Sequence, residues 1–81
     1  MVSSSLKKLL NELVKSKFPF INRIEVYEEK PAFDFHFTSV WVILNRYEDI
    51  QYDKEIREYI EELSMYSGIK INSINFGSEG S

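Results

Sequence analysis

Several features that identify common protein classes are missing from this chain of 81 residues. It has no cysteine, which excludes disulfide bonds and cysteine-ligated zinc sites. His36 is its only histidine, so a transition-metal site would need carboxylates from other segments. The longest apolar run, Val40 to Leu44, is far too short to cross a membrane. Without disulfide bonds or a cysteine-ligated zinc ion, a chain of this size must rely on its own core, or on a partner subunit, for stability.

Motifs that carry catalysis are missing as well. The chain contains no glycine-rich phosphate loop, no Gly-x-Ser-x-Gly nucleophile elbow and no His-Glu-x-x-His pattern. Asp34, His36 and Thr38 share one face of a predicted strand, but neighbours along such a face are separated by about 7 Å. We interpret this row as the solvated side of the strand. The sequence therefore predicts a protein that is not an enzyme and that uses no metal, cofactor or small-molecule substrate.

The charges are distributed unevenly along the chain. The net charge is −3, yet residues 1–23 carry five basic side chains against one acidic side chain. The remaining residues carry five basic and twelve acidic side chains. The N-terminal segment lacks the order of a signal peptide. We therefore expect a cytoplasmic protein that does not associate with membranes.

The first half of the chain predicts a helix followed by a β-hairpin. Apolar residues recur at the helical period over residues 4–17, and Pro19 ends this pattern. The period then changes to two, which predicts one strand over residues 21–28 and a second over residues 33–44. The polar segment that ends at Pro31 predicts the turn between them.

The second strand of this hairpin leaves two arrangements open. Strict alternation places the odd-numbered residues 33–43 on one face and the even-numbered residues 34–44 on the other. A one-residue bulge near Ser39 would instead bring the phenylalanines of residues 33–37 together with Val40, Val42 and Leu44. Both arrangements leave large apolar side chains on the face away from the core. We therefore expect something to pack against that face.

The second half of the chain predicts another helix and a third strand. A short helical turn over residues 47–50 precedes a helix over residues 53–67. Asp53 is the expected N-cap of this helix, and Gly68 is the expected left-handed residue that ends it. A strand is predicted over residues 70–76.

These elements predict one α+β domain over residues 1–76 and a flexible tail over residues 77–81. The order α-β-β-α-β favours a two-layer sandwich with both helices on one face of a three-stranded sheet. The third strand should run parallel to the second, but it can pair beside the second strand or beyond the first. With the turn at 47–50 counted as a helix, this order resembles that of KH-like folds. The Gly-x-x-Gly loop by which that family clamps nucleotides is missing, because residues 44–53 contain no glycine.

The aromatic content favours a protein that binds another protein or itself. Five tyrosines and one tryptophan exceed what the core of so small a domain needs, and tyrosine and tryptophan commonly anchor interfaces. A homodimer, or a phage-type accessory or inhibitor protein, fits this description. The predicted contact residues are Tyr27, Trp41, Ile43 and Tyr47.

The alternative is a nucleic-acid-binding domain. It would use the basic N-terminal helix for the phosphates and the aromatic side chains of the sheet for stacking on bases. Against this alternative stands the acidic total charge. The residues that would bind nucleic acid are Lys7, Lys8, Lys15, Lys17 and Arg23.

Overall fold

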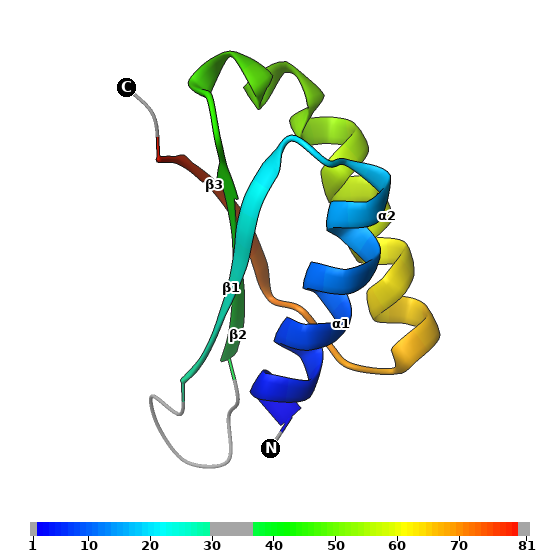
Figure 1. The fold of residues 1–81 in the computed structure, drawn as a ribbon. Helices are drawn as coiled ribbons and strands as arrows, with labels where there is room; N and C mark the ends of the chain where they lie inside the picture. Colours follow the sequence, from blue (N-terminus) through cyan, green and yellow to red (C-terminus); the bar gives the residue numbers. More distant parts are fainter. Residues whose placement is uncertain (1, 30–36, 80–81) are drawn as a thin grey trace.

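The computed structural model describes residues 2–29 and 37–79 (Figure 1). It confirms the α+β class and the order α-β-β-α-β, with a short 3₁₀ helix, η1, ahead of the second helix. The elements are α1 (Val2–Lys17), β1 (Ile21–Glu29), β2 (Phe37–Leu44), η1 (Tyr47–Tyr52), α2 (Asp53–Ser67) and β3 (Ser73–Ser78).

The molecule has two layers. Figure 1 shows α1 and α2 on the same face of the sheet, while the other face is covered by none of the described elements. The strand order is β1-β2-β3. β1 and β2 are antiparallel, and β3 is parallel to β2, as expected from the crossover through α2. Of the two positions left open for the third strand, the structure has the one beside β2.

The core lies between the sheet and the two helices. Leu6, Leu10 and Val14 form the buried stripe of α1, and Ile56 and Ile60 form that of α2. Burial of these apolar side chains is the main source of stability in a domain without covalent links. The strands and the α1–β1 connection contribute the remaining buried hydrophobic residues, which are Phe18, Ile21, Ile24, Val40, Val42 and Leu44.

The described part of β2 alternates without a bulge. Its even-numbered residues are buried beneath the helices, so Thr38 belongs to the core face and the prediction that it lies on a solvated face is wrong. Two hydrogen bonds with Asn72 hold this end of the strand: the Thr38 N–H donates to Asn72 Oδ1 over 2.8 Å, and the Asn72 N–H donates to Thr38 O over 2.9 Å. The one irregularity in the β1–β2 register lies in β1, between Ile21 and Arg23. The predictions for residues 33–36 lie outside the described residues.

Asp53 is not the N-cap of α2, because η1 runs directly into the helix and Tyr52 occupies the capping position. Asp53 instead lies in the first turn, where its negative charge still opposes the helix dipole favourably. Gly68 has the expected left-handed conformation, with φ of 73°, and its N–H donates to Ser64 O. The turn predicted at residues 47–50 is helical and continues to Tyr52.

β3 begins and ends later than its sequence pattern predicts. Gly77 and Ser78, which the sequence places in the tail, pair with Ile43 and Leu44 of β2. Backbone pairing needs no apolar side chain, so a Gly-Ser segment that resembles a linker can still complete a strand. A Cβ atom at Gly77 would lie 3.4 Å from the Ile43 side chain, so the glycine leaves room for Ile43. Within the described ranges, no helix is long and apolar enough to span a membrane.

Candidate interaction surface

The face of the sheet that points away from the helices, called the open face below, carries the aromatic residues of interest. Phe37, Ser39, Trp41 and Ile43 alternate with the buried residues of β2 and therefore point to this side. Trp41 lies in the middle strand and is 39% exposed, while Ile43 is half-buried. The centre of the open face is thus apolar.

The strand register brings three of the four predicted contact residues onto this face. Trp41 lies opposite Glu25 of β1 and Asn75 of β3, and Tyr27 lies two residue pairs further along, opposite Ser39. Tyr27 is 53% exposed. Tyr47 is also exposed, but it lies in η1 beyond the end of β2, outside the strand pairs that build the open face.

A chain of charges borders the apolar centre. Lys7 Nζ lies 2.9 Å from Glu25 Oε1, and Arg23 Nε lies 3.0 Å from Glu25 Oε2. Arg23 also pairs with Glu79, the residue that follows β3. The hydrogen bond from Lys7, followed by its charge and the contact with Arg23, holds the pKa of Glu25 below its usual value. The hydrogen bond to Glu79 raises the pKa of Arg23.

These ion pairs reduce the positive charge that the basic residues have available to bind a phosphate backbone. Lys7 and Arg23, two of the five candidates for nucleic-acid binding, already have carboxylate partners. Lys8 is exposed and Lys15 is half-buried on α1. A basic side chain that is already paired must give up its carboxylate before it can bind a phosphate, so the positive charge of this helix is partly compensated.

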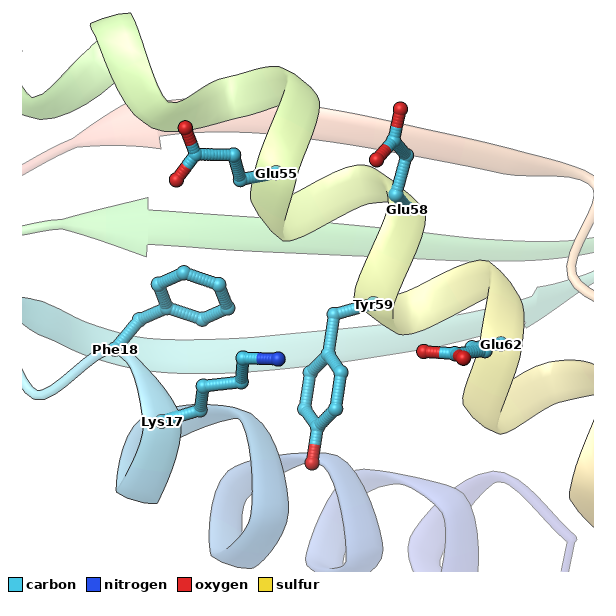
Figure 2. Close-up of a pocket in the computed structure, with 6 residues that line it drawn as sticks. All are labelled: Lys17, Phe18, Glu55, Glu58, Tyr59 and Glu62. Atoms are coloured by element: carbon cyan, nitrogen blue, oxygen red, sulfur yellow. The ribbon is translucent and has the colours of Figure 1, made fainter.

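Lys17 lies in a groove between the end of α1 and α2, shown in Figure 2. Its Nζ lies 4.4 Å from the ring centre of Tyr59, close enough for a cation–π contact. The groove measures about 430 Å³, and its remaining lining includes three glutamates of α2. Carboxylates that line the same groove as the ammonium group disfavour a phosphate at this position. The lining residues are Lys17, Phe18, Glu55, Glu58, Tyr59 and Glu62.

The free edge of β1 is closed by a side chain of α1. Asn11 Nδ2 donates to Ile24 O over 2.9 Å, and Ile24 N–H donates to Asn11 Oδ1 over 3.0 Å. The amide of Asn11 thus makes the two hydrogen bonds that a neighbouring strand would make. A side chain that occupies the outward backbone groups of an edge strand makes pairing with a further strand less favourable at that position.

Asn11, Glu25 and Glu79 were not among the predicted site residues. Opposite charges at Arg23 and Glu25 fall on the same side of a predicted strand, which is a signal for their pair. Asn11 lies on the polar face of a predicted helix and Glu79 in a predicted tail. The three-dimensional arrangement alone shows what these two residues contact.

The described residues contain no group of three or more histidine, cysteine, aspartate or glutamate side chains placed to hold a metal ion. Comparison with family models, with curated proteins and with solved structures finds no match for this chain. The resemblance to KH-like folds therefore stays one of element order.

Proposed function

We propose that this protein is a non-catalytic module that binds another protein through the open face of its sheet. The observation that carries the proposal is the position of Trp41, which is 39% exposed at the centre of a face left uncovered by the described elements. Tryptophan and tyrosine supply much of the binding energy in protein interfaces, usually from the middle of the contact. Trp41 and Tyr27 fit this role.

The chemistry around Trp41 indicates what kind of surface would fit. Ile43 and Phe37 extend the apolar centre along β2, and the ion pairs of Glu25 with Lys7 and Arg23 form a polar border. An apolar centre inside a polar rim is the usual anatomy of a protein interface. The charged border is internally paired, so an apolar patch on the partner is the main requirement. A protein that covers such a patch would act as an accessory or inhibitor protein, in the manner of the phage-type proteins considered above.

A photo-crosslinking experiment tests this proposal. A benzophenone amino acid replaces Trp41 in one variant and Tyr66 in a matched control, because Tyr66 is 87% exposed but lies on α2, in the helical layer. After irradiation in a lysate of the source cells, we expect discrete protein adducts from position 41 and none of the same mass from position 66. Adducts from position 66 alone would contradict the proposal.

The nucleic-acid alternative has its own measurement. Single-stranded RNA and DNA are titrated with the unmodified protein at low and moderate salt, and then with the variants Lys8→Glu and Lys15→Glu. Binding to phosphates weakens steeply as salt rises. Salt-sensitive binding that both variants abolish would favour the alternative over a protein-binding role.

A further inference from the structure

The two edges of the sheet differ in how they are covered. At β1, Asn11 occupies the outward N–H and C=O groups of Ile24. At β3, the sheet order places no described strand further out, and all six residues Ser73–Ser78 are half-buried, whereas alternate residues of β2 are fully buried. Arg57 of α2 reaches this edge too, but it binds only the C=O of Ile74, whereas Asn11 binds both the C=O and the N–H of Ile24.

One contact shows which backbone groups of β3 face outward. Arg57 of α2 donates a hydrogen bond of 3.2 Å to Ile74 O, so this oxygen points away from β2. In a regular strand the backbone of Phe76, two residues later, points the same way. A groove of about 360 Å³ lies beside the first part of this edge, lined by Arg57 and Glu61 of α2 and by residues 71–74.

We propose that the β3 edge pairs with β3 of a second copy of this chain. The two strands run antiparallel, with the two copies of Asn75 facing each other at the two-fold axis. The three-stranded sheet of each copy then becomes half of a continuous six-stranded sheet. This inference does not depend on the proposed function, because it concerns the edge of the sheet and not its open face.

The sequence of β3 is complementary to itself in this arrangement. Pairing about Asn75 places Ile74 of one copy beside Phe76 of the other, on the helix-covered face where both side chains are only half-buried. Pairs of aromatic and β-branched residues across strands stabilise sheets. Ser73 then lies opposite Gly77, so small and polar residues meet on the open face. The Arg57 guanidinium lies over the Phe76 ring, 5.5 Å from its centre, so Arg57 must turn away from this ring and from Ile74 O when the second copy pairs.

The charges favour a second copy in the antiparallel direction. The chain carries a net charge of −3, but Ser73–Ser78 itself contains no charged residue, and the two charged side chains of α2 beside this edge, Arg57 and Glu61, have opposite signs. Lys70 precedes the strand and Glu79 follows it. Antiparallel pairing brings the Lys70 end of one copy to the Glu79 end of the other, whereas parallel pairing would bring two Glu79 residues together. A two-fold axis perpendicular to the sheet also leaves both open faces, each with its Trp41, on the same side.

A single introduced cysteine tests the geometry, because the chain has none of its own. In the proposed dimer the two copies of Asn75 face each other without exchanging backbone hydrogen bonds. In such a pair of residues the two Cα atoms are about 4.5 Å apart. This distance falls within the range that a disulfide spans. We expect Asn75→Cys to form a covalent dimer under mild oxidation, and Tyr66→Cys, exposed on α2, to remain monomeric. Absence of the Asn75→Cys dimer would overturn the proposal.

Sedimentation with charge variants separates this contact from other ways to dimerise. We expect the unmodified chain to sediment at twice its mass of 9.6 kDa at protein concentrations up to about 1 mM. Asn75→Lys and Asn75→Asp should each be monomeric, because like charges would meet at the axis, and an equimolar mixture should dimerise again. Trp41→Lys serves as the control and should still dimerise. A strictly monomeric chain, or a dimer broken by Trp41→Lys but not by Asn75→Lys, would overturn the edge pairing.

Discussion

Leu44 and Ile43 are neighbours on β2, yet they belong to two different environments. Leu44 points into the core and is fully buried, whereas Ile43 points to the open face and is half-buried. The same contrast holds along the strand, where Val40 and Val42 lie beneath the helices and Trp41 between them reaches solvent. One face of β2 therefore stabilises the fold, and the other has large apolar side chains that the fold does not need to bury.

The largest effect should come from the covered face. Leu44→Ala removes a fully buried side chain, and we expect it to lower the free energy of unfolding by about 2–5 kcal/mol. For a domain of this size such a loss approaches the whole stability. Urea denaturation followed by circular dichroism measures it. A loss below about 1 kcal/mol would mean that Leu44 is not part of the core.

Asn11 tests the polar contact that the helix layer makes with the edge of the sheet. Asn11→Ala removes both hydrogen bonds to Ile24, and we expect a loss of about 1–2 kcal/mol. Glu12→Ala, at the next and exposed position of α1, is the matched control and should change stability by less than about 0.5 kcal/mol. Equal effects of the two substitutions would show that the closed edge adds nothing to stability.

Ile43→Ala makes the contrast with Leu44 quantitative. The side chain is half-buried on the open face, so we expect a loss of about 1 kcal/mol in the monomer, well below that of Leu44→Ala. Chemical denaturation at low protein concentration measures the difference. A loss as large as that of Leu44→Ala would show that the open face is covered in solution.

The smallest effect should come from the charged border of the open face. Glu25→Gln breaks the ion pairs with Lys7 and Arg23, which are partly exposed, and should cost less than about 1 kcal/mol at neutral pH. Because the pKa of Glu25 is lowered in the folded protein, its contribution is fully present above the ordinary glutamate pKa of about 4.3 and disappears as the pH falls through the lowered pKa.

Thermal unfolding of the unmodified chain and of Glu25→Gln, between about pH 7 and pH 2, measures this contribution. The two curves should converge in acid. A gap between them that stays constant over the whole range would contradict the assignment. Added salt at neutral pH should reduce the gap, since these pairs are exposed to solvent.

The fold followed from the sequence wherever one face of an element is strongly apolar. The stripes of α1 and α2 and the left-handed residue at Gly68 were predicted because periodicity and glycine chemistry are local. The continuous path from η1 into α2 was not predicted, because an aspartate such as Asp53 is favourable both at an N-cap and in the first turn of a helix. The last residues of β3 were missed because Gly77 and Ser78 pair with β2 through their backbone, and neither residue has the apolar side chain that marks a strand in the sequence.

The candidate surface was predictable only in part. Trp41, Ile43 and Tyr27 share a face because strands have a period of two. Both arrangements left open for β2 put Trp41 and Ile43 on one face, but only the arrangement with a bulge put that face away from the core, and the structure has this placement without the bulge. Tyr47 does not join them, since η1 turns the chain away after β2 ends. Asn11 reaches Ile24, 13 residues further along the chain, and sequence separation of this kind leaves no local pattern.

The parallel pairing of β3 with β2 has a consequence for the order of folding. The contact between Asn11 and Ile24 closes a loop of 13 residues, whereas the contact between Thr38 and Asn72 closes one of 34. The longer loop loses about 0.8 kcal/mol more in chain entropy, and long-range strand pairing is slow. We expect α1, β1 and β2 to assemble first and β3 to dock last. In the native monomer, at protein concentrations too low for dimerisation, the amide protons of β3 should accordingly exchange with solvent before those of β2.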